Sequence, residues 1–258
     1  MGECVNAKAP ARKKSDTGVY HIMLRGINKQ NLFEDNEDRQ RFIDTIEHYK
    51  LVSNYIVYGY CLMNNHIHLL LRETNEPISN AIKRISSSYV YWYNQKYERC
   101  GHLFQERFRS EVVETDAYFL TVLRYIHQNP IKAGIINDIK QFRWSSYQDY
   151  LETPRVSDIN FALDLLSDNR VEAKELFRIF TNEGNDDQCL DYSERKNLTD
   201  EDVKVFLNNL GFSSFMELHR LQKKQRDNVL RELISISGVS TRQLARITGI
   251  SRSVIDRA

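Results

Sequence analysis

The sequence predicts an α+β protein in which an antiparallel sheet with its helices is followed by an all-helical domain. Short segments rich in β-branched and aromatic residues alternate with longer segments of helical periodicity up to about residue 152. From about residue 158 onward, every periodic segment has the helical period. With 41% hydrophobic residues among 258, the chain has enough apolar side chains for a core of this size.

The elements of the first part follow in order from local patterns. They are a strand over 18–26, a helix over 36–53, strands over 55–63 and 66–72, a helix over 77–97, a short strand over 111–113 and a helix over 116–134. Asn64-Asn65 between two apolar runs is typical of a tight turn, so the strands that flank it form an antiparallel hairpin. The order of the first six elements is that of a ferredoxin-like (split βαβ) sheet with helices on one face, and the seventh is a further helix.

The composition excludes several classes of protein. No apolar run approaches the roughly 18 residues of a membrane span, and the basic N-terminal segment lacks the apolar core of a signal peptide. We therefore expect a cytoplasmic protein without a membrane segment. The four cysteines stand singly, which predicts free thiols. A net charge of +1 does not by itself indicate a nucleic-acid binder.

We expect three regions along the chain. Residues 1–17 are predicted to be a flexible basic leader, 18–152 the sheet domain, and 153–258 a helical C-terminal domain that begins after a linker at 152–154.

The end of the chain, about 239–258, has the makeup of a helix-turn-helix. Ser240 is a candidate cap of one helix and Gly249 a turn residue before a second. This pattern favours DNA binding over a plain helical hairpin, with Arg242, Arg246 and Arg252 as candidate contacts.

Two histidines two residues apart open the second strand of the hairpin. Because alternate side chains of a strand share a face, His66 and His68 point the same way and can bind one cation. Two hydrogen-bonded histidines without a metal are an equally good interpretation of this pair alone.

A second pair lies on the helix after the sheet. Tyr125 and Asn129 are four residues apart, so a phenol and an amide face the same point. Beside the histidines, Asn129 offers a third ligand oxygen and Tyr125 a nucleophile. Two nitrogens and one oxygen suit a divalent ion that also binds phosphate, which favours phosphodiester chemistry. A tyrosine packed in the core is the alternative.

These motifs carry a family resemblance. His66-Ile67-His68, the helix with Tyr125 and Asn129, and the blocks over 103–108 and 125–134 resemble the single-tyrosine HUH transposases, IS200-like, and among them the REP-associated tyrosine transposases. The resemblance covers roughly residues 18–151.

The resemblance implies a catalytic domain that cuts single-stranded or hairpin DNA. Tyr125 would form a 5′-phosphotyrosine, and His66 and His68 would hold Mg²⁺ or Mn²⁺. The third ligand in this family is often Gln, so Asn129 is a departure. A homodimer in which the partner subunit supplies the tyrosine stays open.

Other candidates are Arg107 and Arg109, which follow an aromatic loop and either clamp phosphates or lie solvated on a strand. The rival function is a catalytically idle DNA-binding regulator of the same fold. A small-molecule hydrolase with a two-histidine metal site is less favoured, because no acidic motif supplies a general base beside the pair.

Overall fold

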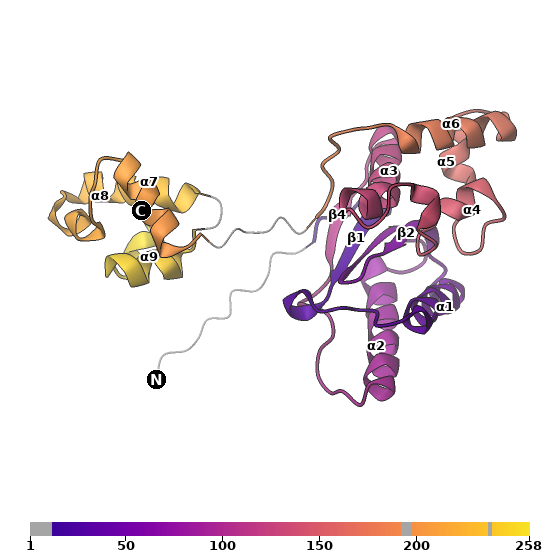
Figure 1. Ribbon diagram of the computed structural model, residues 1–258, viewed down its shortest axis with the longest axis horizontal. Helices are drawn as coiled ribbons and strands as arrows, with labels where there is room; N and C mark the ends of the chain where they lie inside the picture. The colour runs from indigo at the N-terminus through magenta and orange to yellow at the C-terminus, as the bar shows by residue number, and fades with distance from the viewer. Residues whose placement is uncertain (1–11, 192–197, 237–238) are drawn as a thin grey trace. The chain divides into compact units, whose positions relative to one another are not determined.

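The computed structural model describes residues 12–191, 198–236 and 239–258. Contacts divide the chain into two compact units, Met1–Asp191 and Tyr192–Ala258, which are shown in Figure 1 and described separately below.

A four-stranded antiparallel sheet forms the centre of the first unit. Its strands are β1 (Val19–Arg25), β2 (Ile56–Leu62), β3 (His66–Arg72) and β4 (Arg109–Val112). They lie in the order β2-β3-β1-β4, so the hairpin of β2 and β3 stands beside the first strand of the chain. This is the strand order of a ferredoxin-like sheet, and the predicted fold class is confirmed.

Helices cover both faces of this sheet (Figure 1). They are α1 (Asn36–Ser53), α2 (Ile78–Lys96) and α3 (Asp116–Lys132). The first two pack against each other, and Leu24 of β1 lines a pocket with Ile82 of α2. The opposite face carries α3, which approaches β2 at Gly59. The two helices of the split βαβ order therefore share one face, as predicted, and the seventh element takes the other.

Local sequence explains where two of these helices begin. Asp35 and Asp38 form a capping box at the start of α1, in which each side chain accepts a hydrogen bond from the other's backbone N–H. Thr115 caps α3 by accepting from Tyr118 N. Pro130 lies in the last turn of α3, where its missing N–H interrupts little of the helix.

The first unit continues well past residue 152, through the helices α5 (Asn160–Asp164) and α6 (Arg170–Asn182). Its remaining short elements are the 3₁₀-helices η1 (Ile27–Lys29) and η2 (Ile139–Gln141) and the helix α4 (Tyr147–Leu151). Asp158 N donates to Val57 O of β2, and Phe177 stacks on Tyr150 with ring centroids 4.3 Å apart. The contacts therefore put the boundary after Asp191 rather than at the predicted 152/153. The polar segment at 152–154 turns back because Asp149 accepts hydrogen bonds from the backbone beyond it.

Part of the predicted leader is also held to this unit. Residues 1–11 lie outside the described part of the chain. Arg12 donates to Phe108 O at 2.8 Å, and Thr17 Oγ1 donates to Val113 O at 2.6 Å. Residues 12–17 are therefore hydrogen bonded along the β4 segment, unlike the flexible leader that the sequence predicted.

The second unit is helical in all its described elements, as predicted. They are α7 (Asp200–Asn209), η3 (Phe215–Arg220), α8 (Lys223–Ser235), α9 (Thr241–Thr248) and α10 (Arg252–Ile255). Its buried apolar side chains are Val203, Leu207, Leu218, Leu230, Leu233, Leu244, Ile250 and Ile255. Ser240 caps α9, and Gly249 ends it with φ 71°, a conformation that glycine adopts without strain. Across the described residues of both units, no helix has the length and apolarity needed to cross a membrane.

Candidate functional site

The two histidines of β3 lie on the face of the sheet that α3 covers. Ile67 between them is fully buried on the other face, as the two-residue period of a strand requires. His68 is fully buried and His66 is partly exposed, with ring centroids 5.0 Å apart. One imidazole therefore opens toward solvent while the other is held inside.

The amide of Asn129 bridges the two histidines. Its Oδ1 lies 3.1 Å from His66 Nε2, and its Nδ2 lies 3.3 Å from His68 Nε2. Ligand atoms about 2.1 Å from one octahedral ion stand about 3 Å apart, so this spacing is already that of a shared coordination sphere. A half-turn of the amide exchanges its oxygen and nitrogen, so either histidine can face the oxygen. The three side chains therefore fit a divalent cation.

Burial keeps these imidazoles neutral. It holds the pKa of His66 below its usual range and the pKa of His68 well below it, and two neighbouring imidazoles add to the effect at His68. A neutral imidazole keeps one lone pair, which is the form that binds a metal. Among the residues that the structure describes, no group of three or more His, Cys, Asp or Glu side chains could hold a metal. A metal site built on the two histidines would therefore take a third protein ligand from the Asn129 amide.

Tyr125 lies beside the histidines in the same chain. Its ring centroid is 5.7 Å from that of His68, and Lys132 Nζ lies 4.9 Å from the centroid of its ring. Its hydroxyl donates to Asp191 Oδ2 at 2.9 Å. Burial, and then the charge of Asp191, raise the pKa of Tyr125, so its hydroxyl is protonated at neutral pH. The phenol needs a proton acceptor to act as a nucleophile, and a carboxylate stands within hydrogen-bonding distance.

The segment that carries Asp191 runs along one side of α3. Arg124 binds Asp187 through two hydrogen bonds of 2.7 and 3.0 Å, and Gln128 donates to Thr181 O and Glu183 O at 2.8 Å. These two helix residues are four apart, like Tyr125 and Asn129, which sit one position further along. One stripe of α3 therefore holds this segment and the adjacent stripe faces the histidines.

Three residues of this site were not predicted from the sequence. His21 of β1 is fully buried, with Nε2 2.9 Å from His68 Nδ1. Glu111 of β4 lies behind it, and Asp191 approaches from the far end of the unit. The ferredoxin-like order of elements and the alternation along the first strand were the available signal for His21. No periodicity marks Asp191, because it follows an irregular segment.

His127 belongs to the core and not to the site. It is fully buried on another face of α3, where its Nε2 lies 2.8 Å from Ser146 Oγ and three aromatic rings surround it. Burial lowers the pKa of His127 to about 3. The contacts of His127 are therefore those of a core residue.

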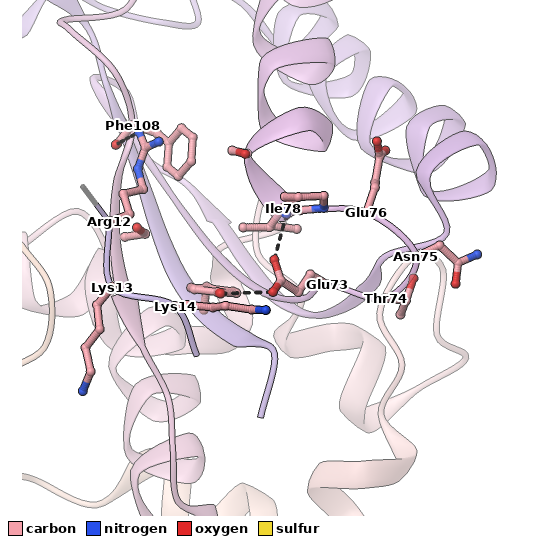
Figure 2. Close-up of a pocket in the computed structure, with 13 residues that line it drawn as sticks. Arg12, Lys13, Lys14, Glu73, Thr74, Asn75, Glu76, Ile78 and Phe108 are labelled. Carbon is pink, nitrogen blue, oxygen red and sulfur yellow. Dashed lines mark hydrogen bonds between the residues drawn. The ribbon is translucent and has the colours of Figure 1, made fainter. Parts of the chain in front are cut away.

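The two arginines near β4 point to different places. Arg109 pairs with Met23, which is itself opposite His68, so it stands on the histidine face of the sheet. Arg107 instead lines a pocket of about 470 Å³ beside Lys83 of α2. An adjoining pocket of about 430 Å³ shares Arg12 and Phe108 with it (Figure 2). Figure 2 shows the Arg12 guanidinium against the Phe108 ring, 3.6 Å from its centroid.

The three candidate arginines of the second unit differ in their contacts. Arg246 makes two 2.7 Å hydrogen bonds to Asp200, which hold α9 to the start of α7. Arg242 and Arg252 are exposed, and Arg252 lies 3.5 Å from Asp256 on the next turn.

Comparison with known proteins shows what the first unit is similar to. Residues 14–129 match the family model described as transposase IS200 like. A Haemophilus influenzae protein whose name assigns it to the REP-associated tyrosine transposases is 28% identical over 145 residues, which are 50% of this chain and 80% of that protein. A solved structure of a REP-associated tyrosine transposase bound to a REP hairpin matches with a TM-score of 0.50 and 13% identity, and covers 59% of this chain and 93% of that one. The family match ends at Asn129, before the second unit begins.

Proposed function

Because residues 14–129 belong to the IS200-like transposase family, we propose that this chain is a tyrosine transposase that cuts single-stranded DNA and rejoins it through a covalent link to Tyr125. The observation that carries the proposal is the convergence of Tyr125, Asn129, His66 and His68 at one point of a single chain. All four side chains belong to the same chain.

The proposed step is a transfer of a phosphate from DNA to the phenol. Tyr125 Oη attacks the phosphorus, the Oη–P bond forms as the P–O3′ bond breaks, and the leaving oxygen takes a proton from solvent. The products are a 5′-phosphotyrosine and a free 3′-OH. A second 3′-OH then attacks the same phosphorus, which joins the new strand end and restores the phenol.

Each residue of the site has a separate task in this step. His66, His68 and Asn129 would hold Mg²⁺ or Mn²⁺, and the ion would polarise the phosphate and offset the charge that develops on it. Asp191 accepts the proton of Tyr125, to which it is already hydrogen bonded at 2.9 Å. Arg109, on the histidine face of β4, would bind a neighbouring phosphate.

Hairpin-bearing single strands are the proposed substrate. The structural neighbour is bound to a REP hairpin, and its fold matches this chain over 93% of its own length. The second unit would add double-stranded DNA affinity through α9 and α10, with Arg242 and Arg252 as contacts. Arg246 is less suited to this role than the sequence predicted, because its guanidinium is already paired with the Asp200 carboxylate.

The test follows each end of a cut strand. A hairpin-bearing single strand labelled at its 3′ end is incubated with the protein and Mn²⁺ and run on a denaturing gel. We expect the 3′ label to move with the protein and a 5′-labelled fragment to be released free. Tyr125→Phe should abolish the linked product, whereas Tyr91→Phe, which changes a 70% exposed tyrosine of α2, should not.

Three results would contradict the assignment. They are the absence of a linked product with the wild type, its persistence in Tyr125→Phe, and attachment of the 5′ label in place of the 3′ label. The first of these, together with retained hairpin binding, would favour the idle DNA-binding regulator.

A further inference from the structure

His21, a histidine outside the proposed ligand set, contacts His68, the buried one of the two histidine ligands. His21 and His68 lie on the neighbouring strands β1 and β3, with side chains on the same face of the sheet. Both are fully buried, and His21 Nε2 lies 2.9 Å from His68 Nδ1. At this distance one ring nitrogen donates a proton to the other, so the two rings fix each other's tautomers.

Glu111 decides the direction of that hydrogen bond. Its carboxylate lies 3.9 Å from His21 Nδ1, which has no hydrogen-bond partner at all among the described residues. A carboxylate favours a ring N–H facing it over a ring lone pair. His21 therefore carries its proton on Nδ1, and its Nε2 accepts from His68 Nδ1–H.

The far side of His68 supports the same direction. With its proton on Nδ1, His68 presents a lone pair on Nε2, which faces the Asn129 Nδ2 donor at 3.3 Å. If the His21–His68 hydrogen bond ran in the opposite direction, a lone pair of His21 would face the Glu111 carboxylate, and His68 Nε2–H would face the amide N–H₂ of Asn129. Two acceptors would then face each other at one end and two donors at the other. Turning the Asn129 amide would remove only the second of these repulsions.

We propose that His21, backed by Glu111, is a positioning residue that holds His68 in the tautomer whose Nε2 can bind the metal. This inference deepens the proposed function and rests on its metal site. His21 is not itself a ligand, because its Nε2 is engaged by His68 and its Nδ1 faces Glu111. Partners of this kind orient a ligand ring and make its bare nitrogen a better donor.

The first test measures metal affinity without DNA or turnover. Binding of Mn²⁺ to the 258-residue chain is titrated by electron paramagnetic resonance for the wild type, His21→Leu, His21→Gln and Tyr91→Phe. Loss of such a partner typically weakens metal binding by about 10- to 100-fold, which we expect for His21→Leu. His21→Gln retains an acceptor oxygen and should recover part of the affinity, and Tyr91→Phe, at an exposed position of α2, should bind like the wild type.

A second variant covers the case in which His21→Leu does not fold. Glu111 lies at the sheet edge with its side chain 36% exposed, so Glu111→Gln leaves the core intact. Its amide faces His21 with a weaker acceptor than a carboxylate, and we expect a severalfold weaker Mn²⁺ affinity. Affinity unchanged in both Glu111→Gln and a folded His21 variant would overturn the proposal.

The tautomer itself gives a readout that needs no metal. Long-range ¹⁵N–¹H spectra of histidine-labelled protein distinguish a protonated Nδ1 from a protonated Nε2. We expect His68 to be protonated on Nδ1, and a proton on its Nε2 would overturn the inference. Failure of the wild type to bind Mn²⁺ would instead contradict the proposed metal site, so the two failures are distinguishable.

Discussion

Replacing Asp191 by Asn should slow DNA cleavage strongly near neutral pH while leaving the tyrosine in place. The carboxylate accepts the Tyr125 hydroxyl proton at 2.9 Å, and an amide of nearly the same shape keeps an oxygen there without the basicity. Asp191 is exposed at the end of the described part of the first unit, so the substitution should not disturb the core.

The size of the loss follows from the ionisation of a phenol. At pH 7.5 a tyrosine at its reference pKa of about 10 is ionised in roughly one molecule in 300. Burial raises the pKa of Tyr125, so without an acceptor the reactive fraction is no larger than this. A positioned base typically contributes about 10²- to 10⁴-fold. We therefore expect cleavage about 10²- to 10³-fold slower than the wild type at pH 7.5.

The dependence on pH identifies the cause. Without an acceptor, the rate should rise about tenfold per pH unit from 6.5 to 9, because only the phenolate reacts. The wild-type rate should change little over that range, so the two profiles converge at high pH. Single-turnover cleavage of the labelled hairpin strand measures the pH profile of the wild type and that of Asp191→Asn. A deficit of equal size at every pH would refute the reasoning, and a faster variant would show that Asp191 restrains the phenol instead.

Two further predictions concern the packing of α3. Gly59→Ala would place a Cβ 2.7 Å from Leu123 Cδ1, so we expect the free energy of unfolding, measured with urea, to fall by about 1–3 kcal/mol. Gly184→Ala is the control, because its Cβ would meet nothing within 4 Å. A larger fall in the free energy of unfolding for Gly184→Ala than for Gly59→Ala would contradict this prediction. Because the folded state lowers the pKa of His127 to about 3, its contribution to stability is complete above about pH 6.5 and falls by about 2 kcal/mol at pH 5. His127→Phe should remove that fall, measured by tryptophan fluorescence; parallel curves for both proteins would count against it.

The sheet could be predicted because each strand carries its own signal. The second hairpin strand begins at His66 and ends at Arg72, as its apolar run and the preceding asparagine turn required. The strand order followed from the sequence of elements alone. The helices predicted from residues 36 and 116 begin at Asn36 and Asp116, and their caps are the preceding residues Asp35 and Thr115.

The domain boundary could not be predicted in the same way. Residues 152–154 are polar and include a proline, which is typical of a linker, yet the segment returns to the sheet through Asp149 and Val57. The position of Asp191 in the site could not be predicted for the same reason. Its approach to Tyr125 depends on the pairing of Arg124 with Asp187, and nothing local in the sequence links these positions.

The residues of the candidate site are held in place in two different ways, so substitutions near them should have different effects. The histidines and Asn129 are fixed by a strand buried on both faces and a helix packed on it, so their spacing is as rigid as the core. Asp191 reaches the phenol from an irregular segment held by side-chain hydrogen bonds. Changes in that segment should therefore alter proton transfer and leave metal affinity unchanged, whereas changes in β1 or β3 should alter metal affinity first. Measuring Mn²⁺ binding and single-turnover cleavage on the same Asp191→Asn protein separates the two, and a loss of both would show that the acceptor and the metal site form one cooperative unit.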